Sequence, residues 1–244
     1  INHPTEAPQK ISEAFRQLRS GRPGPVGLEM PMDIMWKKSE VTLGSRTSGC
    51  PAPLPDPDLV EKAAKILGES QQPMIFVGGG AYEACQEIKT LAETLQAPVI
   101  SYQNGRGILD ERHYLAHTNT AGAILWKNCD AAISIGCRMQ AERMSWGMDD
   151  ALKIIHVDID PTEINRIMKP DVGLVSDAAF TTRKIIDALN KYNLKPLCIT
   201  VKPAMELEIG KKNLENFLKV GVDHIHISPN NKSMALLDKI GFMD

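Results

Sequence analysis

Short apolar runs alternate with helical segments along most of the chain after Asp56. Strand-like runs cover residues 73–77, 98–102, 131–135, 153–158 and 172–175, and helical periodicity covers 57–69, 82–95, 121–128 and 178–190. Apolar runs without polar alternation indicate strands that are buried on both faces, as in a parallel sheet covered by helices on both sides. The pattern therefore predicts an α/β fold, in which ligands bind beyond the carboxyl ends of the strands.

The residues before Asp56 lack this regular alternation of strands and helices. Residues 8–20 have the period of a helix and 26–30 read as a short strand, whereas 37–57 are rich in Pro, Ser, Gly and Thr and lack periodicity, as a linker does. The predicted organisation is a helix and strand in 1–36, a linker in 37–55, a Rossmann-like domain in 56–190 and a βαβα tail in 191–244.

The tail contains two βα units, with strands expected at 197–201 and 224–228. Two consecutive βα units form a right-handed crossover between parallel strands. We therefore expect these two strands to pair with each other in a separate small subdomain.

Composition narrows the classes of partner. A net charge of -2 and a pI near 6.3 provide no basic field, so a small molecule is favoured over nucleic acid. The five cysteines form no CxxC pair, which argues against a disulfide framework or a metal site and favours a cytoplasmic chain. We expect no membrane span, because no run of about 18 apolar residues occurs. The first residues run into a helix without an initiator Met, so we expect a fragment of a longer protein.

Three glycines, Gly78, Gly79 and Gly80, follow the strand PMIFV directly and precede a helix. Backbone amides without a Cβ can approach an anion there, where the helix dipole favours negative charge. The pattern is not the full GxGxxG fingerprint. Both a phosphate-facing turn and simple close packing remain open.

Two acids end the strand in IIHVDIDPTE. A carboxylate at this position can accept hydrogen bonds from ribose hydroxyls. Asp160 is predicted to be the N-cap of a helix that has Pro161 at its first position, with Glu163 completing a capping box. This assignment leaves Asp158 available for a ligand.

Two arginines follow other strands. Arg138, after Gly136 and Cys137, can pair with phosphate or stack on a flat ring, the alternative being a solvated side chain. Arg106, flanked by glycines in a polar loop, is interpreted as part of a flexible rim. His156 lies inside a strand and is expected to be a core residue with satisfied hydrogen bonds. No Ser-His-Asp set, metal cluster or carboxylate pair can be placed together, so we predict neither a catalytic nor a metal site.

Five motifs occur in a specific order: ISEAFRQLRSGRPGPVGLEMPMDI, QQPMIFVGGGA, AAISIGCRM, IIHVDIDPTEI and VGLVSDAAF. With them, residues 8 to about 190 resemble the thiamine diphosphate-dependent enzymes of the acetolactate synthase group. The first motif is similar to the closing helix and strand of the family's pyrimidine-binding domain, and the others to its central domain. The resemblance implies a Rossmann-like six-stranded parallel sheet that holds FAD in some branches, an adenine nucleotide such as ADP or coenzyme A in another, and neither in others.

The resemblance also implies residue roles. The positions that match those around the adenine nucleotide are Gly78, Gly79, Arg138, Asp158, Ile159 and Asp177, to which we add Gly80 and Arg106 as candidate ligands. This match favours phosphate binding by the glycine turn. Flavin-binding members continue with Phe-Asp-Asp-Arg after the arginine, whereas here Met139-Gln-Ala-Glu-Arg143 follows, which argues against FAD specifically.

The family's catalytic glutamate and its GDG motif, which binds thiamine diphosphate and magnesium, do not occur in these 244 residues. The resemblance therefore implies these cofactors only in a complete parent enzyme, and a chain that is inactive by itself.

The tail, YNLKPLCITVKPAMELEIGKKNLENFLKVGVDHIHISPNNKSMALLDKIGF, resembles part of the N-acetyl sugar amidotransferases of the PP-loop type. This second resemblance implies a fusion at about Leu189-Asn190. Two other hypotheses remain open: a Rossmann-type enzyme that uses NAD, as sirtuin-like relatives of this sheet do, and a non-catalytic module that self-associates through its tail.

Overall fold

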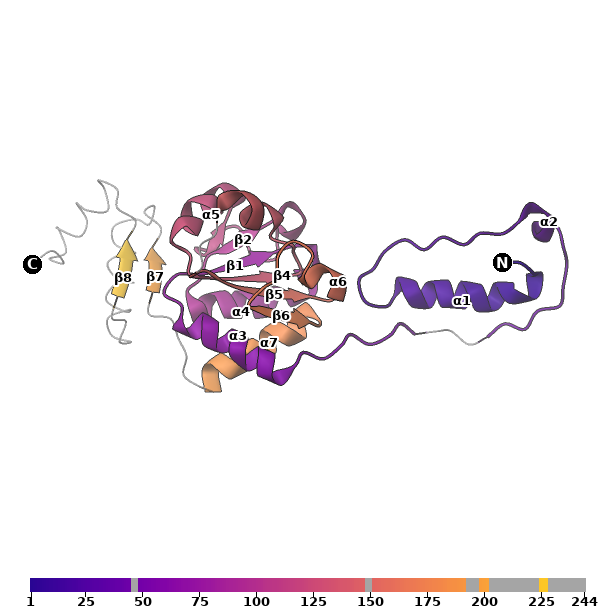
Figure 1. Ribbon diagram of the computed structural model, residues 1–244, viewed down its shortest axis with the longest axis horizontal. Helices are drawn as coiled ribbons and strands as arrows, with labels where there is room; N and C mark the ends of the chain where they lie inside the picture. The colour runs from indigo at the N-terminus through magenta and orange to yellow at the C-terminus, as the bar shows by residue number, and fades with distance from the viewer. Residues whose placement is uncertain (45–47, 148–150, 192–197, 202–223, 228–244) are drawn as a thin grey trace, which may run out of the picture. The chain divides into compact units, whose positions relative to one another are not determined.

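The computed structural model describes residues 1–44, 48–147, 151–191, 198–201 and 224–227. The chain divides into two units, Ile1–Leu54 and Pro55–Asp244 (Figure 1).

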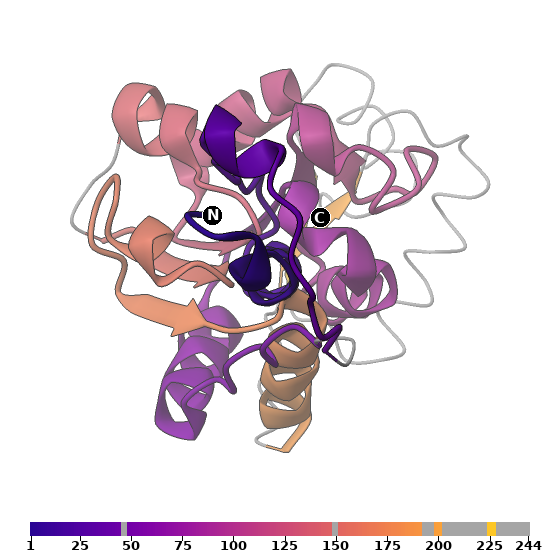
Figure 2. The same ribbon diagram turned by 90° about the vertical axis from the view of Figure 1, so that its right-hand side faces the viewer.

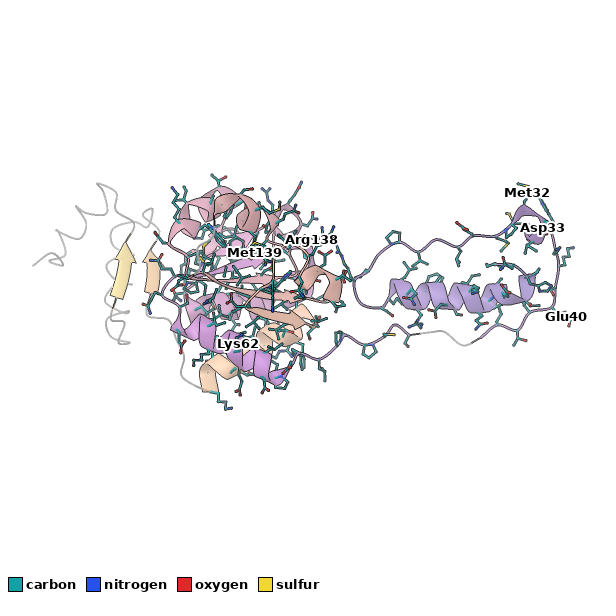
Figure 3. All side chains as sticks on the ribbon, viewed as in Figure 1. Met32, Asp33, Glu40, Lys62, Arg138 and Met139 are labelled. Atoms are coloured by element: carbon teal, nitrogen blue, oxygen red, sulfur yellow. The ribbon has the colours of Figure 1, made fainter. Side chains whose placement is uncertain are left out.

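The first unit contains little regular structure. It consists of a 3₁₀ turn η1 (Pro4–Glu6), helix α1 (Ala7–Leu18) and the short helix α2 (Met32–Met35). Residues 26–30, predicted as a strand, form none, because a strand requires a hydrogen-bonded neighbour and the described part of this unit offers no other strand. Apolar side chains are exposed here, among them Phe15 on α1 and Met32, which Figure 3 labels.

The second unit is built on a six-stranded parallel sheet with the order β3-β2-β1-β4-β5-β6 (Figure 1). Its strands are β1 (Pro73–Val77), β2 (Val99–Ser101), β3 (Ala116–His117), β4 (Ala131–Ile135), β5 (Lys153–Asp158) and β6 (Val172–Val175). The prediction of a Rossmann-like α/β fold is confirmed. All five positions of β1 and of β4 are buried, which explains why these strands show no alternation between apolar and polar residues.

One face of the sheet is covered by three helices, α3 (Pro57–Glu69), α4 (Cys85–Leu95) and α7 (Ala178–Lys191). Figure 2 shows α3 and α7 side by side, and the two helices are in contact. The core under them includes Leu67, Ile75, Ile133, Leu91 and Ile185. Along β1 and β4, Ile75 and Ile133 of this core alternate with Phe76 and Ala132, which belong to the core on the opposite face.

The opposite face is covered by α5 (Asn119–Leu125), the 3₁₀ turn η4 (Trp126–Asn128) and the one-turn π-helix η5 (Glu142–Trp146). Its core is aromatic. The Phe76 ring meets the Trp126 ring edge-on with centroids 5.7 Å apart, and the Trp146 centroid lies 6.3 Å away. This packing joins the π-helix to the sheet.

In the tail, β7 (Cys198–Val201) pairs in parallel with β8 (His224–Ile227) in a two-stranded sheet of its own. This is the pairing that the two βα units predict. The remaining tail, including most of the amidotransferase-like stretch, lies outside the described residues. Among the described helices, none combines the length and the apolar character that a membrane span needs.

Candidate functional site

The candidate residues gather along one edge of the sheet. The chain order reverses between β1 and β4, and ligands of such sheets bind at this switch point, beyond the carboxyl ends of the strands. Each of five neighbouring strands has candidate residues at or after its carboxyl end. In the order β2, β1, β4, β5 and β6, these residues are Arg106, Gly78 to Gly80, Arg138, Asp158 with Ile159, and Asp177. Adjacent parallel strands thus bring together residues that are far apart in the sequence.

The glycine turn packs against the loop that follows β4. The amide of Gly78 donates to Ile135 O at 3.3 Å, and that of Gly80 donates to Gly136 O at 3.2 Å. A Cβ on Gly78 would lie 2.5 Å from Cys137 Cβ, and one on Gly80 would lie 2.8 Å from Gly136 Cα. Close packing of two loops therefore accounts for these two glycines. Gly79 differs, because a Cβ there would come no nearer than 3.4 Å to Asn104. Gly79 and Gly80 are both exposed.

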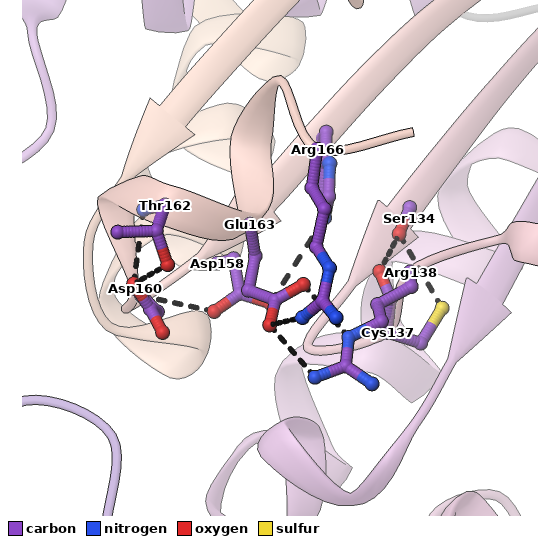
Figure 4. A network of polar contacts seen from close by, with 9 residues as sticks. Ser134, Cys137, Arg138, Asp158, Asp160, Thr162, Glu163 and Arg166 are labelled. Carbon is purple, nitrogen blue, oxygen red and sulfur yellow. Dashed lines mark hydrogen bonds and ion pairs between the residues drawn. The ribbon is translucent and has the colours of Figure 1, made fainter. Parts of the chain in front are cut away.

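Arg138 is held by a buried carboxylate on α6 (Pro161–Ile164), as Figure 4 shows. Its Nε and Nη2 donate to the two carboxylate oxygens of Glu163, each at 2.7 Å, and Arg166 Nη1 donates to Glu163 Oε1 at 2.8 Å. The Glu163 side chain is 2% exposed, whereas that of Arg138 is 39% exposed. The hydrogen bond from Arg138, followed by that from Arg166, lowers the pKa of Glu163 to about 2. The guanidinium of Arg138 is thus fixed in orientation and still reaches solvent.

The capping box predicted for Glu163 is wrong. Asp160 is the N-cap as expected, since its carboxylate accepts from the Thr162 amide at 2.9 Å. Its own backbone amide, however, donates to Asp158 Oδ1 at 2.9 Å. Glu163 instead faces Arg138, 25 residues away in the sequence. As a consequence, one carboxylate oxygen of Asp158 already has a partner, and the other, Oδ2, has more acceptor capacity left for a ligand.

The other candidates differ in how they are engaged. Asp177 caps α7, with Oδ1 accepting from the Phe180 amide at 2.8 Å. Ile159 is half-buried, and Arg106 is exposed. The loop of Arg106 packs on the end of β1, because a Cβ on the preceding Gly105 would lie 2.4 Å from Val77 O. Arg106 therefore stands next to the glycine turn.

His156 is buried in β5, as expected, but the expectation that its hydrogen bonds are satisfied is wrong. Neither ring nitrogen has a hydrogen-bond partner within the described part of the chain, and Nε2 lies 3.9 Å from Asp158 Oδ2. Burial lowers the pKa of His156 and favours the neutral ring. The described residues also contain no group of three or more His, Cys, Asp or Glu that could hold a metal ion.

Sequence reasoning missed a buried carboxyl group near this edge. Glu142, in the π-helix, has no exposed surface and accepts a hydrogen bond from the hydroxyl of Tyr102, which follows β2. Burial raises the pKa of Glu142 to about 7. No signal in the sequence marks this residue, because its burial depends on how the segment after Arg138 folds back over the sheet.

We expect Glu142→Gln to stabilise the chain at pH 8 by about 1 to 3 kcal/mol. Because the folded pKa is raised, the folded chain keeps a proton that the unfolded chain releases, and the free energy of unfolding falls as pH rises from about 4.5 to about 7. The glutamine removes this loss. Urea denaturation from pH 5 to 8 measures the effect as the difference between variant and wild type, with Glu83→Gln as an exposed control. A difference that does not grow with pH would contradict it.

Residues 60–189, more than half of the chain, match the family described as the thiamine pyrophosphate enzyme central domain. The chain belongs to this family. The resemblance to the thiamine diphosphate-dependent enzymes of the acetolactate synthase group is thereby confirmed.

Among curated proteins, this thiamine pyrophosphate enzyme domain is similar to acetolactate synthases. It is 31% identical to the acetolactate synthase large subunit of Corynebacterium glutamicum, over 77% of this chain and 32% of that protein. It is 32% identical to an acetolactate synthase of Arthrospira platensis, over 72% of this chain and 34% of that protein. The chain thus spans about a third of the length of these relatives.

The fold of this thiamine pyrophosphate enzyme domain also resembles a solved structure. A Mycobacterium smegmatis protein described as a thiamin diphosphate-dependent enzyme superposes with a TM-score of 0.65 at 18% identity, covering 76% of this chain and 38% of that one. At this identity the likeness concerns the fold alone.

In this thiamine pyrophosphate enzyme domain, the segment after Arg138 buries two charged residues. Met139 has a positive φ of 47° and is buried, and both residues are labelled in Figure 3. The chain then enters the π-helix, in which Glu142 and Arg143 are also buried. The two charged residues of this segment therefore lie beneath the protein surface.

Proposed function

We propose that this chain supplies the central domain of an acetolactate synthase-like, thiamine diphosphate-dependent carboligase or decarboxylase. We further propose that the carboxyl edge of its sheet binds the adenine-containing part of a cofactor. Membership of the family and the similarity to acetolactate synthases support the first statement. The geometry of the edge supports the second.

The free hydrogen-bond donors of Arg138 are the main support for the binding proposal. Arg138 stands beside the switch point with two of its five N–H donors engaged by Glu163, so three remain for a phosphate. On the neighbouring strand β5, Asp158 has a second carboxylate oxygen for a ribose hydroxyl. Exposed Gly79 and Arg106 add donors on the other side of the switch point. The residues therefore fit an adenine nucleotide, with Arg138 as the main phosphate ligand rather than the amides of Gly78 and Gly80.

The segment that follows Arg138 favours ADP or coenzyme A over FAD. Flavin-binding members of the family have two aspartates and an arginine in this segment. Here its charged residues, Glu142 and Arg143, are buried and cannot contact a ligand at the surface of the domain. Thiamine diphosphate with magnesium would supply the covalent chemistry in a complete enzyme. We therefore expect the 244-residue chain alone not to join two pyruvate molecules.

Titration calorimetry on the full chain tests the binding proposal with ADP, coenzyme A, FAD and NAD as separate ligands. We expect heat with ADP or coenzyme A, and an affinity at least about tenfold weaker in Arg138→Ala, since a charge-assisted hydrogen bond contributes about 1.5 to 3 kcal/mol. Arg112→Ala is the matched control, because Arg112 is 90% exposed and pairs locally with Asp110.

Three results would count against the proposal. Folded protein that gives no heat with any adenine-containing ligand would leave a domain with a structural role only. Equal losses in the two arginine variants would mean that Arg138 is not a ligand. Carboligation of pyruvate by the chain alone would overturn the expected inactivity.

A further inference from the structure

The strongest unassigned feature of the edge is that one carboxylate holds two arginines. Glu163 Oε1 accepts from Arg138 Nη2 at 2.7 Å and from Arg166 Nη1 at 2.8 Å, so the two guanidinium groups lie next to each other (Figure 4). Arg166 is 56% exposed and, like Arg138, reaches solvent. The carboxylate that joins them does not.

We propose that Glu163 is a positioning residue that holds Arg138 and Arg166 together as a two-guanidinium clamp for the diphosphate group of a ligand. The proposal deepens the proposed function, on which it rests for the identity of that ligand. It adds Arg166 as a second phosphate-binding residue and assigns Glu163 to orientation rather than to contact.

The charges around Glu163 set the side from which an anion can approach. Two guanidinium groups share one buried carboxylate, which leaves a net charge of about +1 in the three-residue cluster. Asp158 and Asp160 also lie close enough to Arg138 to raise the pKa of its guanidinium, so the five side chains together carry a formal charge of -1. A diphosphate must therefore contact the guanidinium groups directly, from the exposed side of the cluster.

Preorganisation gives the buried carboxylate its effect on binding. A free arginine side chain loses rotamer freedom when it binds an anion, whereas one already held by a bidentate contact loses little. Glu163 also sits on α6, whose start is held by the Asp160 cap and Pro161. The backbone that follows β5 thus places Glu163, and Glu163 in turn holds both guanidinium groups.

The sign of one substitution separates positioning from simple charge attraction. Glu163→Gln removes a negative charge beside the anion, so long-range electrostatics alone predicts tighter binding of diphosphate. Positioning predicts the opposite, because the neutral amide holds the arginines weakly and itself brings donors that oppose them. We expect affinity at least about tenfold weaker in Glu163→Gln.

The experiment measures the binding of inorganic diphosphate and of ADP to the full chain by calorimetry, with adenosine as the ligand without phosphate. We expect wild type to bind both phosphorylated ligands, Glu163→Gln and Arg166→Ala to bind each of them more weakly, and Arg112→Ala to match wild type. Circular dichroism establishes that each variant is folded. Because Arg166 is exposed, Arg166→Ala provides the test if Glu163→Gln does not fold.

The outcomes separate the two proposals. Binding of diphosphate but not of ADP, lost in both variants, supports the clamp and overturns the nucleotide function. Unchanged or tighter diphosphate binding in folded Glu163→Gln overturns the positioning role, and unchanged binding in Arg166→Ala overturns the two-arginine clamp. Wild type that binds neither phosphorylated ligand overturns both proposals.

Discussion

Gly136→Ala is expected to destabilise the second unit by about 3 to 5 kcal/mol. Gly136 has a φ of +58°, and a Cβ there would lie 2.5 Å from the backbone carbon of Gly80. The alanine therefore adds two costs, a left-handed conformation that disfavours a side chain and an overlap with backbone atoms that cannot rotate away. The loops after β1 and β4 would have to separate at the switch point.

Gly107→Ala isolates the first of these costs. Gly107 also has a positive φ, +87°, but no atom lies within 4 Å of the position of a Cβ. We expect a loss of only about 1 kcal/mol. Urea denaturation followed by circular dichroism compares the two variants, and equal losses would show that the loops are not in close contact at Gly136.

Phe76→Ala is expected to cost about 3 to 5 kcal/mol of stability. Phe76 is fully buried in β1, and its ring packs against Trp126 from η4 and Trp146 from the π-helix. Removing the ring leaves a cavity between the sheet and the segment that follows Arg138. Both the transfer free energy of the ring and its aromatic contacts are lost.

Two companion variants make the measurement specific. Phe76→Leu fills much of the cavity and is expected to cost about 1 to 2 kcal/mol. Tyr82→Ala removes an aromatic side chain that is 54% exposed and should change stability by less than about 0.5 kcal/mol. The near-ultraviolet circular dichroism signal of the tryptophans should weaken in Phe76→Ala only. A loss for Phe76→Ala as small as that for Tyr82→Ala would contradict the packing described above.

Local patterns were sufficient to predict most of the elements of the second unit. The bounds predicted for β1, β4, β5 and β6 agree with the structure, because each strand is a mostly apolar run that is followed by polar or glycine residues. By contrast, β3 has two residues and shows no periodicity, and residues 26–30 resemble a strand but pair with no other strand in the described part of the chain. In these two cases pairing decides the structure, and pairing is not a local property.

For the candidate site, too, some features could be predicted from the sequence and others could not. Its residues could be placed at one edge from the sequence, because residues after parallel strands share the carboxyl end of the sheet. Their partners could not be predicted. Glu163 has the spacing of a capping box, but in the folded chain Arg138 approaches from 25 residues away and takes its carboxylate.

The sequence by itself determined the fold class, the family and the edge at which the polar residues collect, since each of these follows from the order of short local patterns. Only the tertiary structure decided that Gly78 and Gly80 pack against the loop of Gly136, and that Arg138 shares Glu163 with Arg166. The physical reason is that a hydrogen bond or an overlap depends on distances of a few ångströms between atoms, and the register of β1, β4 and β5 sets those distances.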